Sequence, residues 1–226
     1  MSQTHLKLAP AAVLFDLDGT LVDSAPDLAG TANEMRQRRG LEALPFAVLR
    51  PHGGSGARGL LGAAFGVVPG DEQYGALRDE FLQHYEQRLL RLTRVFEAVD
   101  AVLQALQQRG LRWGIVTNKA LRYADPLARG LGLWPRAAVL VAGDSTPHAK
   151  PHPAPLLEAA RRLDLEPGRC VYVGDDERDM RAARAAGMAG WAAGWGYLGL
   201  QQPLQAWGAD VVLAHPSELL KSLDLA

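Results

Sequence analysis

The feature that most constrains this chain is a short apolar run near its start. Residues 11–15 read Ala-Ala-Val-Leu-Phe, and the run stops abruptly at Asp16. An apolar run without polar alternation is typical of a strand that is buried on both faces, as strands of parallel sheets are. A carboxylate that directly follows such a strand needs a partner, because burying an unpaired charge is costly. The run therefore predicts a parallel strand, buried on both faces, with a functional carboxylate at its end.

The second half of the chain alternates short apolar runs with helical patterns. Such alternation predicts right-handed strand–helix–strand units and a parallel sheet covered by helices on both faces. We therefore expect an α/β fold with a doubly wound parallel sheet. The predicted strands are 113–116, 138–142, 170–173, 190–193 and 210–213, and the predicted helices are 98–109, 153–163 and 177–186.

A mostly helical stretch separates the first predicted strand from the others. It contains a predicted helix at 27–39 that ends at Gly40, and a second at 71–91 with apolar residues at helical spacing. A glycine-rich segment, 51–59, lies between them. We expect residues 1–24 and 96–226 to form an α/β core, and residues 25–95 to form an all-α cap domain inserted after the first strand. Segments near Asp23 and Val95 are the predicted hinges.

Composition excludes several classes of protein. The 226 residues carry 24 Lys and Arg against 25 Asp and Glu, a net charge of −1, which argues against a nucleic-acid partner. The one cysteine, Cys170, excludes an internal disulfide framework and fits a reducing compartment. The apolar run before Asp16 is far shorter than the roughly 20 residues of a membrane span, and no signal-peptide pattern is present. We expect a cytoplasmic protein without membrane partners.

Polar side chains capable of chemistry follow the predicted strands or precede a predicted helix. In open α/β sheets, groups in such positions converge at the carboxyl ends of the strands, where ligands bind. The candidates are Asp16 and Asp18, Thr117 and Asn118, Lys150, and Asp175 and Asp179.

The residue types in this set favour one kind of reaction. Converging carboxylates repel one another unless a cation lies among them, and Mg²⁺ prefers carboxylates, water and phosphate oxygens as ligands. The hydroxyl of Thr117, the amide of Asn118 and the ammonium of Lys150 suit an anion with several oxygens. A cation, a set of side chains that binds an anion and a free carboxylate together indicate phosphoryl transfer through an aspartyl-phosphate.

The same residues carry a resemblance to a known family. Asp16-Leu17-Asp18-Gly19-Thr20, Val116-Thr117-Asn118, Lys150-Pro151, and Gly174-Asp175 with Asp179 appear in the order of the four motifs of the haloacid dehalogenase superfamily. The chain resembles the members of this superfamily that are phosphatases with a helical cap after the first strand, and in particular the phosphoglycolate phosphatase-like branch.

This resemblance implies a role for each motif residue. Asp16 would be the nucleophile, and Asp18 would be the general acid and then the general base. Thr117, Asn118 and Lys150 would bind the phosphoryl oxygens, and Lys150 would also keep Asp16 ionised. The Mg²⁺ ligands would be Asp16, the backbone carbonyl of Asp18, Asp175 and, through water, Asp179. Halide needs no protonation as it leaves, whereas an alkoxide does, so Asp18 favours a phosphatase over a dehalogenase.

The substrate stays open at this stage. The resemblance implies a small phosphorylated metabolite, either N-acetylmuramic acid 6-phosphate or 2-phosphoglycolate, handled by a monomer or homodimer. Arg58, in the glycine-rich segment, is a candidate to bind a substrate carboxylate. His52 is a weaker candidate, and Asp176 is either a functional or a helix-capping carboxylate. The alternatives are a phosphomutase of the same fold and a non-catalytic sensor of a phosphorylated ligand.

Overall fold

A six-stranded parallel sheet forms the centre of the computed structural model, which describes residues 10–199 and 202–224. The strand order is β5-β4-β1-β6-β7-β8, so β1 lies between β4 and β6, and the connections lead away from it in both directions. This arrangement confirms the predicted α/β class. The strands are β1 (Ala12–Phe15), β4 (Arg112–Val116), β5 (Leu140–Val141), β6 (Cys170–Gly174), β7 (Ala189–Ala193) and β8 (Val211–Leu213).

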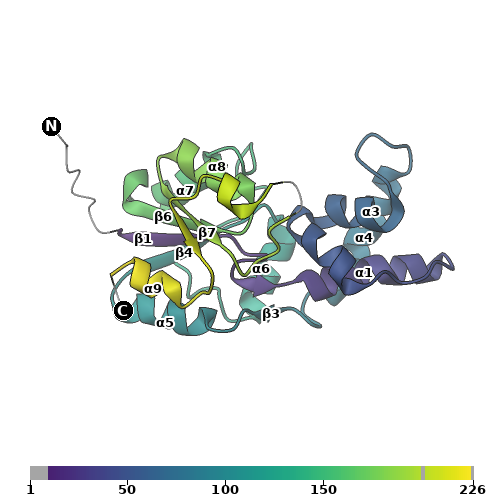
Figure 1. Cartoon of the computed structure of the whole chain (residues 1–226), viewed down its shortest axis with the longest axis horizontal. Helices are drawn as coiled ribbons and strands as arrows, with labels where there is room; N and C mark the ends of the chain where they lie inside the picture. The colour runs from purple at the N-terminus through teal and green to yellow at the C-terminus, as the bar shows by residue number, and fades with distance from the viewer. Residues whose placement is uncertain (1–9, 200–201, 225–226) are drawn as a thin grey trace.

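Helices cover both faces of the sheet, and β1 shows why its apolar run has no polar alternation. Val13 and Phe15 belong to the cluster that includes α5 (Val99–Gln108) and α9 (Glu218–Ser222). Ala12 and Leu14 belong to the opposite cluster, with α7 (Ala154–Arg162) and α8 (Glu177–Ala186). Figure 1 shows these two pairs of helices on opposite sides of the sheet. Each large apolar side chain buried here stabilises the fold by about 1.5–3 kcal/mol.

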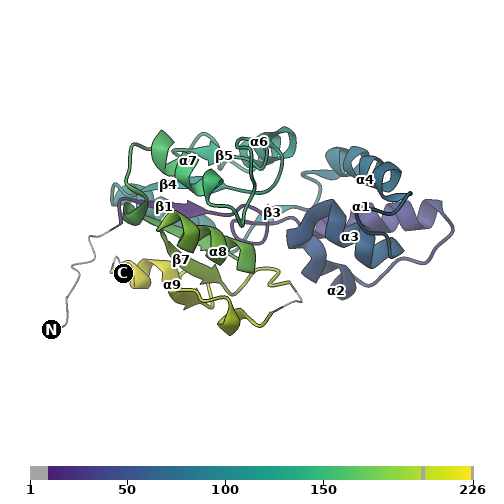
Figure 2. The same cartoon turned by 90° about the horizontal axis from the view of Figure 1, so that it is seen from above.

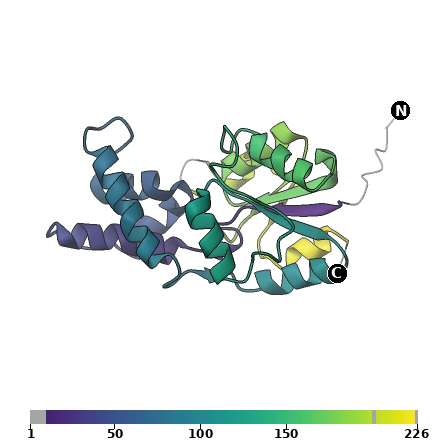
Figure 3. The same ribbon diagram turned by 180° about the vertical axis from the view of Figure 1, so that it is seen from behind.

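Residues 25–95, between β1 and α5, form a separate group of helices, which we call the helical insert. Figures 1, 2 and 3 show this group beyond one end of the sheet. Its two connections to the core, β2 (Val22–Asp23) and β3 (Arg94–Val95), pair with each other as a short antiparallel ladder. The two segments expected to be hinges therefore lie side by side. The insert consists of α1 (Ala25–Arg38), α2 (Phe46–Leu49), the 3₁₀ helix η1 (Arg50–Ser55), α3 (Gly56–Phe65) and α4 (Tyr74–Arg88).

Two sets of buried hydrogen bonds fix the start of the insert. The carboxylate of Asp27 in α1 accepts hydrogen bonds from the backbone amides of Leu92 and Thr93, at 2.8 Å each. The hydroxyl of Tyr197, in the loop after β7, accepts from the amides of Ser24 and Ala25, at 2.7 and 2.9 Å. The first set joins α1 to the segment just before β3, and the second joins the insert to the core.

Some elements differ from the sequence-based expectation. Helix α4 is shorter at both ends than the predicted 71–91, and β5 has two residues where 138–142 was predicted. The glycine-rich segment contains η1 and the start of α3, although glycine disfavours helices. Helix α6 (Leu121–Gly130) was not predicted because proline inside a helix usually breaks it, and Pro126 lies inside α6. Burial of one face of α6, including Leu127, offsets that cost.

None of the helices in the described part of the chain is long and apolar enough to cross a membrane.

Candidate active site

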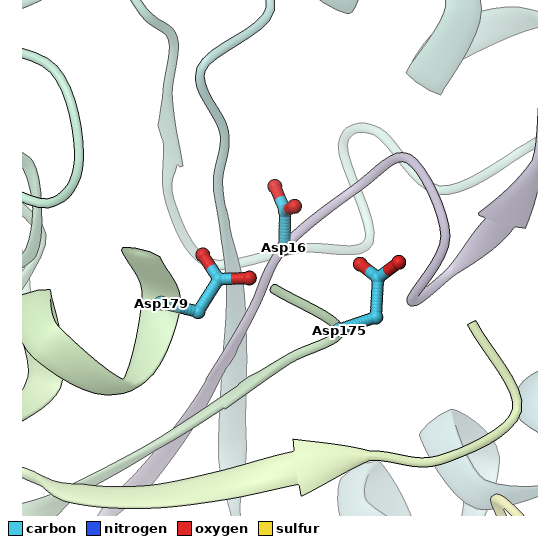
Figure 4. A group of neighbouring side chains, drawn as sticks. All are labelled: Asp16, Asp175 and Asp179. Atoms are coloured by element: carbon cyan, nitrogen blue, oxygen red, sulfur yellow. The ribbon is translucent and has the colours of Figure 1, made fainter. Parts of the chain in front are cut away.

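Three carboxylates from separate segments meet at the carboxyl end of the sheet. Asp16 directly follows β1, Asp175 directly follows β6, and Asp179 lies in the first turn of α8. Figure 4 shows these three side chains gathered around one place. One oxygen from each carboxylate lies within 4.8 Å of the others, and Asp175 and Asp179 are buried. The strand ends thus bring together three of the acidic residues that the sequence singled out.

The electrostatics of this carboxylate group are unfavourable without a further cation. Burial, and then the charges of Asp16 and Asp179, raise the pKa of Asp175 well above its usual range. Burial also raises the pKa of Asp179 to about 6, with Lys150 opposing the shift and Asp16 adding to it. The buried Oδ1 of Asp16 receives no well-aligned hydrogen bond from any described group. Three close carboxylates, one of which has an oxygen without a well-aligned donor, fit a hard divalent cation.

Lys150 is the cation already present in this group. Its Nζ lies 2.9 Å from Oδ1 of Asp16 and 2.8 Å from Oδ1 of Asp179, and the side chain is only 2% exposed. It also donates to the hydroxyl of Tyr172 at 2.6 Å and to the carbonyl of Val116 at 3.0 Å. Burial alone would lower the pKa of Lys150, but the adjacent carboxylates raise it, so the ammonium stays charged beside Asp16.

Asn118 positions Lys150 through the backbone. Its side-chain amide donates to the carbonyl of Lys150 and accepts from the amide of the same residue, each at 2.9 Å. The hydroxyl of Thr117 is buried and accepts a hydrogen bond from the amide of Lys119 at 3.1 Å. Both residues lie at the end of β4, next to β1 in the sheet. From the sequence, we expected both residues to contact a phosphoryl group. In the structure, Asn118 also holds the loop that carries Lys150.

Asp18 lies two residues beyond Asp16, in the loop before β2. Its Oδ1 accepts a hydrogen bond from the hydroxyl of Ser24 at the start of the insert. The ammonium of Lys119 lies 3.0 Å from both of its carboxylate oxygens. Gly19 permits this tight loop because it adopts a φ of +85° and because a Cβ atom there would collide with the carboxylate of Asp175.

A cavity of about 290 Å³ opens beside Asp18, between the core and the helical insert. Its volume is close to the lower end of the usual range of ligand pockets, about 300–1,000 Å³. The core side of the lining includes Asp18, Asn118, Lys119 and Tyr123, and the insert side includes Gly53, Ser55, Gly56, Ala57, Phe81 and Tyr85. If the reacting group of a ligand were bound at Asp16 and Asp18, the rest of the ligand would occupy this cavity.

Arg58 and His52 lie elsewhere. They line a second cavity, of about 210 Å³, at the seam between the insert and α8. Asp176, which lies on the same cavity, caps α8: its carboxylate accepts from the amide of Arg178, while Asp179 accepts from the amide of Asp176. Asp176 also forms an ion pair with the side chain of Arg178, at 2.7 Å. This agrees with the helix-capping interpretation of Asp176.

Several residues at the site carried no assigned role in the sequence analysis. Tyr172 was hidden inside a buried strand, and Lys119 adjoins Thr117 and Asn118 but has no distinctive spacing. Tyr197 lies 22 residues from Asp175, yet its backbone amide donates to Oδ2 of that residue at 2.8 Å. Thr20, next to Gly19, donates to Oδ1 of Asp175 at 3.0 Å. The one sequence signal for a role of Thr20 was its position directly after Asp16-Leu17-Asp18-Gly19.

The site geometry and the fold agree with comparisons to known proteins. The sequence profile of the haloacid dehalogenase-like hydrolases matches residues 10–187. A phosphoglycolate phosphatase of Xanthomonas campestris is 49% identical over 211 residues, which cover 93% of this chain and 95% of that protein. The N-acetylmuramic acid 6-phosphate phosphatase of Pseudomonas aeruginosa is 40% identical over 215 residues, covering 95% of each chain.

A solved structure shows the same architecture. The crystal structure of a predicted phosphoglycolate phosphatase from Haemophilus somnus superposes with a TM-score of 0.83 at 27% identity, covering 95% of this chain and 98% of that one. The parallel sheet and the three aspartates at its carboxyl end agree with the architecture of a hydrolase of this structural class. The chain belongs to the haloacid dehalogenase-like hydrolases.

Proposed function

We propose that this protein is a Mg²⁺-dependent phosphomonoesterase that acts through an aspartyl-phosphate on Asp16. The observation that supports this most directly is the position of Asp16. Its carboxylate lies 2.9 Å from the ammonium of Lys150 and within 4.8 Å of carboxylate oxygens of Asp175 and Asp179. A carboxylate nucleophile needs to remain ionised, and a neighbouring ammonium favours the ionised form.

Each residue has a distinct task in this proposal. Asp16 attacks phosphorus and forms the phosphoryl–aspartate, while Asp18 gives a proton to the leaving alkoxide. Asp18 then takes a proton from the water that hydrolyses the intermediate. Thr117, Asn118 and Lys150 hold the phosphoryl oxygens, which stabilises the charge that develops on them in the transition state.

The cation assigned to this site is Mg²⁺. Asp16, Asp175 and the backbone carbonyl of Asp18 would be its ligands, with Asp179 acting through water. When bound, it would neutralise part of the charge on the phosphoryl oxygens and on the carboxylate group. The hydrogen bonds from Thr20 and Tyr197 orient Asp175 for this task.

The helical insert, residues 25–95, serves as a cap in this proposal. It forms one wall of the cavity beside Asp18, so its closure would exclude water from the phosphoryl group. The paired strands β2 and β3 are the hinges. We propose that the enzyme works in the cytoplasm on a small phosphorylated metabolite. The names of its relatives supply two candidate substrates, 2-phosphoglycolate and N-acetylmuramic acid 6-phosphate.

Phosphate release in the presence of Mg²⁺ tests this proposal. The wild-type protein should release phosphate from at least one of the two esters, and Asp16→Asn should lose this activity while it unfolds at a similar temperature. Asp125→Asn is a matched control, because Asp125 lies on the surface and pairs only locally with Arg129. Phosphate release by Asp16→Asn at the wild-type rate would refute the assignment of Asp16 as the nucleophile. If the wild-type protein binds an ester but releases no phosphate from it, the protein is a sensor of a phosphorylated ligand.

A further inference from the structure

The cavity beside Asp18 has few charges on its wall. Among the described residues that line it, only Asp18 and Lys119 carry charged side chains. Arg58, the cation that the sequence suggested for a substrate carboxylate, is not part of this lining. The side chain of Lys119 is 9% exposed, and its Nζ lies 4.8 Å from the centre of the Tyr85 ring on the opposite wall.

Two buried tyrosines that line this cavity have hydroxyl groups without a well-aligned hydrogen-bond partner. Tyr85, from α4 of the insert, and Tyr123, from α6 of the core, are 2% and 4% exposed. Neither hydroxyl has a well-aligned hydrogen-bond partner among the described residues, although the ammonium of Lys119 lies close to the hydroxyl of Tyr85. Burying a hydroxyl without a partner costs free energy, so each of these groups calls for a ligand atom or a water molecule. Their ring centres lie 5.9 Å apart, so the two rings form one aromatic patch.

The beginning of α3 adds a further polar element to the same wall. Gly56 and Ala57, its first two residues, line the cavity, and no side chain caps this end of the helix. The N-terminus of a helix carries a partial positive charge. It lies on the same cavity as the Lys119 ammonium, so the wall offers positive charge from the insert as well as from the core.

We propose that Lys119 determines substrate specificity by binding a carboxylate of the leaving group, while Tyr85 and Tyr123 bind its hydroxyl or amide groups. This inference rests on the proposed phosphatase function, because it assigns the cavity to the part of the ester that leaves. Aromatic walls suit the apolar face of a sugar ring, and an ammonium suits a carboxylate. The substrate class is therefore the phosphate ester of a carboxylated sugar rather than that of a two-carbon acid.

Lys119 pairs with Asp18 before the substrate arrives. In the proposed complex the ammonium stays in reach of both carboxylates, one from Asp18 and one from the leaving group. The substrate's carboxylate thereby locates its ester oxygen close to Asp18. A mismatched ester, which lacks the carboxylate, would still reach Asp16 but would lose this alignment.

A matched pair of esters tests this assignment. N-acetylmuramic acid 6-phosphate and N-acetylglucosamine 6-phosphate share the sugar and the phosphate, and only the first carries a lactyl carboxylate. The wild type should prefer the first ester, and Lys119→Met should reduce the ratio of the two kcat/KM values by about 10- to 100-fold, mainly through KM. Lys119→Arg should restore part of the ratio. Lys221→Met, in the surface helix α9, is the control.

A second comparison tests the hydroxyl groups of Tyr85 and Tyr123. Tyr85→Phe and Tyr123→Phe should each raise KM for the sugar esters more than for 2-phosphoglycolate, which is too small to fill the cavity. Tyr74→Phe, on the same helix as Tyr85 but outside the cavity lining, is the control. If the wild type prefers 2-phosphoglycolate to both sugar esters, the assignment of the cavity to a sugar is wrong.

Two further outcomes separate this inference from the proposed function. Equal losses with both sugar esters in Lys119→Met would mean that Lys119 acts only through Asp18, which overturns the specificity role while leaving the phosphatase intact. Calorimetric binding of the two esters to Asp16→Asn, alone and combined with Lys119→Met, needs no turnover. If binding shows a Lys119-dependent preference and the wild-type protein releases no phosphate from either ester, this inference is supported and the phosphatase function is refuted.

Discussion

The ammonium of Lys119 lies 3.0 Å from both carboxylate oxygens of Asp18, across 101 positions of the sequence. This ion pair links the end of β4 to the loop after β1, and it lies on the cavity that the helical insert completes. Ser24, at the start of the insert, holds the same carboxylate through its hydroxyl. Asp18 is therefore held by one group from the core and one from the first connection to the insert.

Asp18→Asn is expected to trap the covalent intermediate. An amide cannot give a proton to the alkoxide or take one from water, so kcat should fall by about 10²- to 10⁴-fold. With a reactive ester whose leaving group needs no proton, Asp16 should become phosphorylated and stay so. Intact-protein mass spectrometry would detect one added phosphoryl group, and Asp16→Asn combined with Asp18→Asn should show none. A prompt return to the unmodified mass would argue against Asp18 as the base.

Mg²⁺ should stabilise the protein more at neutral than at acidic pH. The pKa of Asp179 is about 6 against an ordinary 3.8, because it is buried and lies close to Asp16. In the metal-free protein this group therefore favours the folded state fully below about pH 4, and that contribution is lost as the pH rises through about 6. A cation that binds the ionised carboxylates opposes this loss.

Thermal unfolding with Mg²⁺ or with a chelator measures the effect. At 100 times its Kd, a ligand adds about 2.7 kcal/mol to the free energy of unfolding. We expect an increase of this order near pH 7.5 and a clearly smaller one near pH 5, since protons compete with the metal for the carboxylates. A Mg²⁺ effect that is equal at both values, or larger at the acidic one, would contradict the assignment of these carboxylates as ligands.

Tyr197→Phe should loosen the junction between insert and core. The lost hydroxyl accepts hydrogen bonds from the buried amides of Ser24 and Ala25, and an unpaired buried donor costs about 1–3 kcal/mol. Tm should fall by about 2–4 °C for each kcal/mol lost in a chain of this size. Tyr74→Phe is the control, since Tyr74 lies on α4 away from the junction. If both variants keep the wild-type Tm, the Tyr197 hydroxyl does not fix the junction.

The sequence by itself determined the sheet and the positions of its reactive groups. The run that became β1 was recognisable because a strand buried on both faces shows no polar alternation, and Asp16 stood out as the charge that ends it. The expected places of Thr117, Asn118 and Asp175 followed from the same local pattern. Helix α8 matches its predicted bounds because its residues favour a helix and Gly187 ends it. Helix α6 was not predicted from the sequence because Pro126 interrupts the local helical pattern.

Only the tertiary structure decided which of these groups touch one another. Lys150 bridges Asp16 and Asp179, and Asn118 fixes the loop that carries it, through contacts between residues at least 29 positions apart in the sequence. Lys119, Tyr85 and Tyr123 meet at one cavity because the insert packs against the core, and no local pattern encodes that packing. Propensity and periodicity act over one turn or one strand, whereas the position of a buried charge is set by every neighbour that compensates it.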